Sequence, residues 1–167
     1  MEINRIAPDF ELRDLNGQIY RLSLYRGRIV IVNFWSAECP HSERTDRLIL
    51  ACLARWGADV AMLSVAANRN ESVEALSQAV NARAIPTVLK DAEHVAADLY
   101  DAQTTPHVFV VDRDGILRYR GAVDDVSFRQ RAAKRFYLEE AVEALLANRT
   151  IELSETPAYG CAIVREV

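Results

Sequence analysis

Runs of apolar residues alternate with helix-like patterns along most of this chain. Residues 28–34 hold five apolar residues among seven, which is typical of a strand buried on both faces. In residues 39–56 the apolar positions recur every three or four places, as on one face of a helix. The same patterns predict strands at residues 59–66, 107–112 and 116–120, a short extended piece at residues 85–89, and helices at residues 71–83, 94–100 and 128–147.

Each long predicted helix has an expected core face. In the helix at 39–56 this face is Leu48, Ile49, Cys52, Leu53 and Trp56, and Gly57 ends the helix. In the helix at 71–83, Asn70 is the expected cap, and the core face is Val73, Leu76 and Val80. In the helix at 128–147 the core face is Phe128, Ala132, Phe136, Val142 and Leu145.

The N-terminal part predicts a β-hairpin. Residues 7–12 and 18–24 flank the sequence Asp-Leu-Asn-Gly at residues 14–17, which is a turn signal with Asn-Gly at its centre. Strands that alternate with helices and then close in a hairpin are typical of an α/β fold with a mixed sheet. We therefore predict one domain over residues 1–167, in which residues 148–167 form a C-terminal tail.

Composition narrows the functional classes. The chain has 167 residues, enough to bury a core without staples, and its formal net charge of −4 gives no basic footprint for nucleic acid. Apolar runs are too short to predict a membrane segment. The first twelve residues contain no apolar signal-peptide stretch, so we expect a cytoplasmic protein, with an exported or tethered form left open.

Cys39 is the strongest candidate for chemistry. It directly precedes Pro40, and proline is favoured at the first position of a helix, so Cys39 is expected to be the N-cap. Free backbone N–H groups and the positive end of the helix dipole then favour the thiolate, which is the nucleophilic form of cysteine. A protonated His41 would stabilise that thiolate further, whereas Ser36 could either cap the turn or donate a hydrogen bond near the sulfur.

The segment Phe-Trp-Ser-Ala-Glu-Cys-Pro-His-Ser at residues 34–42 resembles the active site of the thioredoxin superfamily, in its redoxin or peroxiredoxin-like branch (alkyl hydroperoxide reductase and thiol-specific antioxidant). Its Pro-His pair also resembles that of periplasmic disulfide oxidases. The resemblance covers about residues 7–147, with further markers at residues 7–12, 104–112 and 114–121. It implies a thioredoxin-like fold. The family motif Cys-x-x-Cys is here Cys-x-x-Ser, with Ser42 at the second cysteine.

Ser42 limits the reaction, because a serine can donate a hydrogen bond to a thiolate but cannot resolve a mixed disulfide. Cys39 therefore needs a second thiol from Cys161, another protein or a small molecule. Cys161 follows Gly160, and some peroxiredoxin-like relatives end in a similar Gly-Cys segment, so it is a possible resolving cysteine; the alternative is a small apolar residue in a C-terminal strand. Cys52 is expected in the core, about 20 Å along the helix from Cys39 and beyond disulfide reach.

The resemblance assigns further positions. Thr105-Pro106 matches the family's cis-proline, whose neighbouring backbone pairs with extended substrates. Peroxiredoxins of this fold carry an arginine where Pro106 stands, and Arg44 and Arg120 are candidate substitutes. Copper-delivery relatives use two cysteines and a histidine.

For copper, this chain could offer only Cys39, His41 and His107, so we expect no metal and no other cofactor.

Three hypotheses follow. The first is a thiol-dependent oxidoreductase in which Cys39 performs thiol–disulfide exchange, helped by Ser42, His41, Ser36, Thr105 and Pro106. The second is a peroxiredoxin-like peroxide reductase with an antioxidant role. The third is a non-catalytic binding module with an unreactive Cys39. The expected partners are a thiol reductant (a thioredoxin-like protein or a small thiol) and a disulfide or peroxide substrate.

Overall fold

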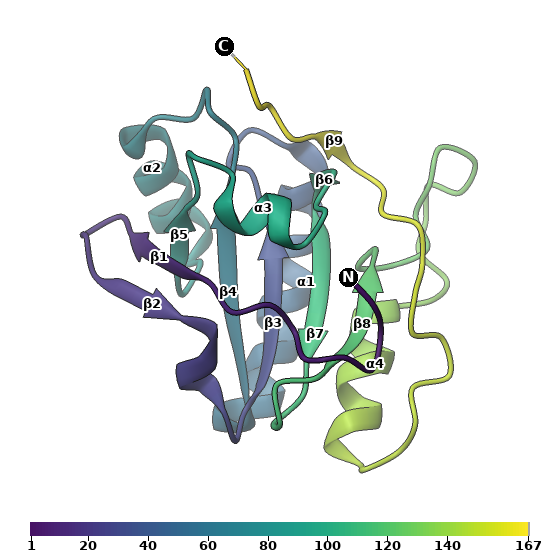
Figure 1. Cartoon of the computed structure of the whole chain (residues 1–167). Coiled ribbons are helices and arrows are strands. Elements are labelled where there is room, and N and C mark those ends of the chain that lie inside the picture. Colours follow the sequence, from purple (N-terminus) through teal and green to yellow (C-terminus); the bar gives the residue numbers. More distant parts are fainter. Residues whose placement is uncertain (167) are drawn as a thin grey trace.

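The computed structural model describes residues 1–166 and has a thioredoxin-like α/β fold (Figure 1). A seven-stranded mixed sheet has the strand order β2-β1-β5-β4-β3-β7-β8, and a separate two-stranded sheet pairs β6 with β9. The strands are β1 (Glu11–Asp14), β2 (Ile19–Arg21), β3 (Ile29–Phe34), β4 (Val60–Ala66), β5 (Val88–Lys90), β6 (Thr104–Thr105), β7 (His107–Val111), β8 (Leu117–Gly121) and β9 (Cys161–Ala162). The helices are α1 (Pro40–Trp56), α2 (Val73–Arg83), α3 (Val95–Leu99) and α4 (Tyr137–Leu146), with short 3₁₀ turns at Leu22–Tyr25 and Gly57–Asp59.

The central strand β3 is covered on both faces, as its apolar sequence predicts. It runs parallel to β4 and antiparallel to β7, and all six of its residues are buried. Ile29 and Ile31 pack against α1 and α4, whereas Val30, Val32 and Phe34 pack on the other face near α3 and the N-terminal segment. Figure 1 shows α1 behind the sheet and α3 in front of it. The end of β3 is therefore fixed in the centre of the molecule, where the active-site loop begins.

The N-terminal hairpin and α1 are confirmed. β1 and β2 pair antiparallel, with Glu11 opposite Arg21. Cys39 is the N-cap of α1, Pro40 is its first residue and Gly57 ends it. Ile49, Cys52 and Trp56 are buried on its inner side, and Leu48 and Leu53 are partly buried against the same cluster.

The predicted helix at residues 128–147 is wrong in its first half. Helix α4 begins only at Tyr137, and Phe128 is 85% exposed instead of facing the core. Residues 125–135 form a loop that Asp125 closes: its carboxylate accepts a hydrogen bond from the Lys134 backbone N–H, and its own N–H donates to the Arg135 carbonyl. Such local side-chain bonds compete with helix formation. Ala132 and Phe136 are exposed as well, while Val142 is buried and Leu145 is half-buried.

Smaller boundaries also differ. The first strand of the hairpin is Glu11–Asp14 rather than residues 7–12. Helix α2 begins at Val73, and its cap is Ser72, whose hydroxyl accepts a hydrogen bond from the Ala75 N–H at 3.1 Å, rather than Asn70. Val73 is therefore at the first turn and is exposed, although Leu76 is buried as expected. The second strand of the hairpin ends at Arg21, because residues 22–25 turn into a 3₁₀ helix that buries Leu22.

Candidate active site

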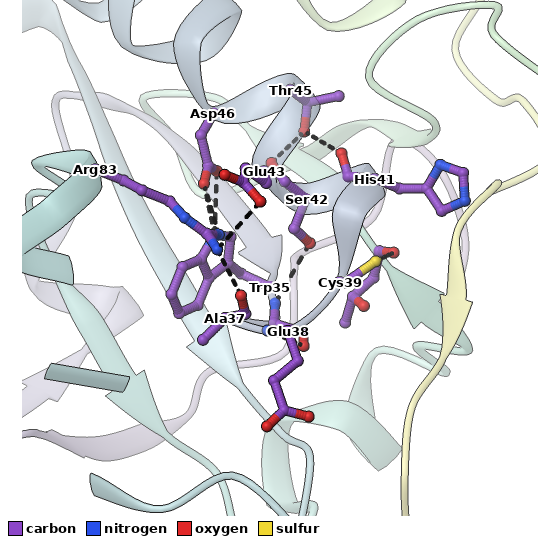
Figure 2. A network of polar contacts seen from close by, with 12 residues as sticks. Trp35, Ala37, Glu38, Cys39, His41, Ser42, Glu43, Thr45, Asp46 and Arg83 are labelled. Carbon is purple, nitrogen blue, oxygen red and sulfur yellow. Dashed lines mark hydrogen bonds and ion pairs between the residues drawn. The ribbon is translucent and has the colours of Figure 1, made fainter. Parts of the chain in front are cut away.

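Cys39 lies at the junction between the β3 loop and α1. Its backbone is extended (φ −80°, ψ 117°), as at an N-cap, and its carbonyl accepts the first helical hydrogen bond from Glu43 N–H at 3.1 Å. Only 3% of the residue is exposed. The side chain lies on the side of the loop that faces the C-terminal strand (Figure 2). Its thiol is thus covered by the tail rather than open to solvent.

The sulfur of Cys39 has two close partners from distant parts of the chain. Its Sγ lies 3.0 Å from the carbonyl oxygen of Thr105 and 2.7 Å from the Sγ of Cys161. Both cysteines are free thiols. A disulfide bond is about 2.05 Å long. The two sulfurs therefore need only a small movement to become bonded.

The two thiols have opposite pKa shifts. Burial acts to raise the pKa of Cys39, but the hydrogen bonds with the Cys161 thiol and with Thr105, together with the backbone N–H of Ser42, outweigh burial, so the pKa of Cys39 is lowered. Burial raises the pKa of Cys161 to about 11, and the hydrogen bond and negative charge of Cys39 act in the same direction. Cys39 therefore ionises first, with Cys161 as its hydrogen-bond donor.

The C-terminal tail reaches Cys39 by a defined path. Figure 1 shows it running past β8 to place β9 beside β6. Glu155 binds Arg120, and the Thr156 hydroxyl accepts a hydrogen bond from the Ala122 N–H at 3.0 Å. Further along, Thr105 stands opposite Cys161 in the antiparallel β6–β9 pair. The tail is thus anchored on both sides of Cys161, because Ile163 also donates its N–H to the Gln103 carbonyl.

The active-site loop is held from the opposite side by a buried ion pair (Figure 2). The Nε1 of Trp35 donates to the Asp46 carboxylate at 3.0 Å, and Arg83 pairs with Asp46 at 3.4 Å. Arg83 also donates to the Ala37 carbonyl at 2.5 Å and lies over the Trp35 ring. Asp46 is 3% exposed, and burial raises its pKa despite these partners. This network fixes residues 35–38 and therefore the position of Cys39.

A second buried carboxylate, that of Glu71, supports the same loop. It is 2% exposed, and its Oε1 accepts hydrogen bonds from the Ser36 hydroxyl at 2.8 Å and from the Glu38 N–H at 3.1 Å. The Ser36 oxygen also accepts from the Glu38 N–H, so Ser36 caps the turn, which is one of its two expected roles. Burial raises the pKa of Glu71 despite these donors.

Ser42 and His41 lie beside Cys39 with different neighbours from those expected. The buried Ser42 hydroxyl accepts a hydrogen bond from the Ser36 N–H at 3.4 Å, and it is the backbone N–H of Ser42 that favours the thiolate. The His41 ring packs edge-to-face against Tyr159, with 5.0 Å between ring centroids. Through this contact, His41 helps to hold the tail beside Cys39.

The Thr105–Pro106 peptide bond is cis, and Pro106 is buried next to β7. His107 follows it, and burial, with the charge of Arg120, lowers the pKa of His107 to about 4. His107 is thus neutral near pH 7. Among residues 1–166, no group of three His, Cys, Asp or Glu side chains is arranged to hold a metal ion.

Both arginines considered as peroxide-binding groups are engaged elsewhere. Arg44 makes a two-pronged ion pair with Asp124, at 2.7 and 3.0 Å. Arg120 binds Glu155 at 2.6 Å and the Met1 carbonyl at 2.9 Å. None of these bonds joins either guanidinium to Cys39.

The sequence does not indicate the burial of Glu71, the Asp46–Arg83 pair or the steric role of Gly160. Glu71 was counted as the first residue of a helix, and a charged residue in a polar turn gives no signal of burial. A Cβ on Gly160 would lie 2.0 Å from the Thr105 carbonyl oxygen, so this glycine allows the tail to approach β6. The sequence shows the Gly160-Cys161 pair, but it does not show that Thr105 lies beside it. Cys52 is buried in the core as expected, and burial raises its pKa.

The fold and the site define a thioredoxin-like protein with a cysteine at the start of a helix. The sequence model of the AhpC/TSA family matches residues 3–120, and the chain belongs to this family. The matched region ends before the tail that carries Cys161.

Curated relatives share part of the chain. Thiol-disulfide oxidoreductase ResA of Geobacillus kaustophilus is 29% identical over 116 residues, which are 68% of this chain and 65% of ResA. Thiol:disulfide interchange protein DsbE of Vibrio cholerae is 27% identical over 129 residues, which are 76% of this chain and 68% of DsbE. The chain thus spans about two thirds of the length of these relatives.

A solved structure with a matching fold covers the whole chain. It is a hypothetical protein of Sinorhizobium meliloti, 26% identical, with a TM-score of 0.88 over 100% of this chain and 96% of that one. The tail is included in this match. Among residues 1–166, no helix has the length and apolar character needed to cross a lipid bilayer.

Proposed function

We propose that the protein is a thiol–disulfide oxidoreductase in which Cys39 is the nucleophile and Cys161 is its resolving partner. The observation that carries this proposal is the 2.7 Å separation of their sulfurs at the start of α1. The names of the curated relatives support the reaction class. The lowered pKa of Cys39 supports its role as the attacking group.

The reaction has two exchange steps. The Cys39 thiolate attacks one sulfur of a substrate disulfide, and the other substrate sulfur leaves as a thiolate that takes a proton from water. Cys161 then loses its proton and attacks the Cys39 sulfur, which releases the reduced substrate and leaves a Cys39–Cys161 disulfide. A thiol reductant, either a thioredoxin-like protein or a small thiol, restores both cysteines. Ser42 takes no part in resolution, because a hydroxyl cannot carry out this exchange.

The proposed location is the cytoplasm, where thioredoxin and glutathione thiols act as reductants. Substrate access then requires the tail to move, because Cys39 is 3% exposed beneath it.

A test compares three single variants in the turnover of a disulfide substrate with a thiol reductant. Cys39→Ser abolishes turnover. Cys161→Ser slows it and accumulates a mixed disulfide on Cys39, identified by mass spectrometry. Cys52→Ser is the control and keeps wild-type turnover, since Cys52 is buried in the α1 core away from the site. Full turnover by Cys39→Ser would refute the proposal.

Peroxide reduction is a second candidate, favoured by membership of the AhpC/TSA family. The Cys39 thiolate would attack one peroxide oxygen and become a sulfenic acid, while the other oxygen leaves as hydroxide; Cys161 would then displace the sulfenic hydroxyl, which leaves as water, to form the same disulfide. The engagement of Arg44 and Arg120 with carboxylates weighs against rapid peroxide activation. Loss of one equivalent of hydrogen peroxide within seconds would favour this candidate over exchange.

A binding module without catalysis is the third hypothesis. It requires an unreactive Cys39, and the lowered pKa of that thiol weighs against it.

A further inference from the structure

The tail occupies the site beside Cys39 in the manner of a bound peptide. Strand β9 pairs with β6, and the next residues continue the contact through Gln103 and Asn68, whose side chain accepts the Val164 N–H at 2.8 Å. In peptide recognition by strand addition, backbone hydrogen bonds supply affinity and side-chain fit supplies selectivity. The tail therefore shows which side chains fit beside β6 and Cys39.

Gly160 fills a position with no room for a side chain. A Cβ there would lie 2.0 Å from the Thr105 carbonyl oxygen, 2.7 Å from the Thr105 carbonyl carbon and 3.1 Å from the Pro106 nitrogen. All three atoms belong to the backbone, so no side chain can rotate to relieve the contact. As the tail lies on β6, the position directly before the reacting cysteine therefore has room only for glycine.

The neighbouring positions have milder demands. The Tyr159 ring packs against His41, and Ile163 is 7% exposed within the core cluster around Phe34 and Tyr100. Ala162 points outward and is exposed. Residues 159–163 of the tail thus present, in order, an aromatic residue, a glycine, a cysteine, an unrestricted position and an aliphatic residue.

We propose that strand β6 at Thr105 pairs, in place of the tail, with an extended partner segment whose disulfide-bonded cysteine directly follows a glycine. The inference rests on the proposed function and names its substrate class. The Cys39 thiolate forms a bond to the sulfur of the partner cysteine, and the second partner sulfur leaves as a thiolate. The tail competes with the partner at high effective concentration, because both pair with β6 at Thr105 and the tail is covalently attached.

The test uses the full chain with Cys161→Ser, in which the mixed disulfide on Cys39 cannot be resolved internally. Two capped peptides, Tyr-Gly-Cys-Ala-Ile and Tyr-Ala-Cys-Ala-Ile, are each joined through their cysteine to thionitrobenzoate. Because thionitrobenzoate is the better leaving thiol, its coloured release reports attack on the peptide sulfur. We expect the glycine peptide to react about tenfold faster or more, because the Cβ of the alanine peptide would overpack against a rigid backbone.

A second variant separates selection from competition. Gly160→Ala, added to Cys161→Ser, forces the tail away from Thr105 by the same collision. We expect the glycine peptide to react faster than with the single variant, while the alanine peptide remains slow. Ala162→Ser is the matched control on the same strand, because Ala162 is exposed, and it leaves both rates unchanged.

The outcomes distinguish this inference from the proposed function. Equal rates for the two peptides overturn the glycine selection but leave Cys39 an exchanging thiol. Fast reaction with the free aromatic disulfide (the bis-thionitrobenzoate reagent), combined with slow reaction of both peptides, also overturns the inference. If Cys39 reacts with none of the three disulfides in either variant, the proposed function itself fails.

Discussion

Replacing Cys161 with alanine is expected to make Cys39 less acidic. In the structure, the Cys161 thiol lies 2.7 Å from the Cys39 sulfur and is the first of the groups that outweigh burial in lowering the pKa of Cys39. Cys161→Ala removes this donor and adds none. The burial of Cys39, which is 3% exposed, then acts against the thiolate with less opposition, and its pKa rises.

The size of the effect follows from the bond that is lost. A hydrogen bond to a charged group contributes about 1.5–3 kcal/mol, and because water can partly replace the thiol we take the lower end of that range. This corresponds to about a tenfold smaller thiolate fraction at a pH below the pKa of Cys39, since 1.4 kcal/mol is a factor of about ten.

The assay is the rate of iodoacetamide alkylation of Cys39 across pH, followed by peptide mapping. The rate at high pH reports access to the sulfur, and the midpoint of the profile reports its pKa, so the two effects are separated. Cys161→Ser is the matched control, because its hydroxyl keeps a donor at the same position and shifts the midpoint less. An unchanged midpoint in Cys161→Ala would refute the assignment of Cys161 as the donor.

Three further predictions concern the support of the loop and the folded state. Glu71→Ala leaves the Ser36 hydroxyl without its acceptor and lowers the free energy of unfolding in urea by about 2 kcal/mol, whereas Glu71→Gln keeps an acceptor oxygen and costs less than half of that; equal losses would contradict the role of the carboxylate as an acceptor. Arg83→Ala leaves buried Asp46 without its cation and costs about 3 kcal/mol, and Arg83→Lys recovers part of it; if lysine recovers nothing, the charge is not what matters. With the His107 pKa lowered to about 4 by burial, the unfolded chain binds a proton between about pH 6.5 and 4 that the folded chain does not, so stability falls by about 3 kcal/mol as the pH is lowered through this range, and His107→Gln flattens that part of a urea-denaturation series.

The core elements of the fold were predictable because their sequence patterns are determined locally. Within a few residues, the apolar run of β3 indicates a buried strand and Cys39-Pro40 indicates a helix start, and both are confirmed. The prediction for the first half of the last helix was wrong for a reason that is also local. There, Asp125 bonds to residues nine and ten positions later and closes a loop that the helical spacing of Phe128 and Phe136 does not reveal.

The site was only half predictable. Cys39 was marked by its position next to Pro40, whereas its 2.7 Å contact with Cys161 joins residues 122 positions apart in the sequence. No local pattern encodes such a contact, and Cys161 is a candidate resolving cysteine in the sequence only through the resemblance of its Gly-Cys segment to that of peroxiredoxin-like relatives. Glu71 and Gly160 were missed for the same reason, because the burial of one and the steric demand on the other depend on Ser36 and Thr105, which are distant in sequence.

The most direct test of the central claim is the state of the wild-type chain after reaction with one equivalent of oxidised glutathione. Intact mass is measured first, and a peptide map under non-reducing conditions then locates any linkage. The Cys39–Cys161 couple predicts a chain lighter by the mass of two hydrogens, with the peptides of these two cysteines joined and Cys52 still free. A stable glutathione adduct on Cys39, with Cys161 still open to alkylation, would contradict it.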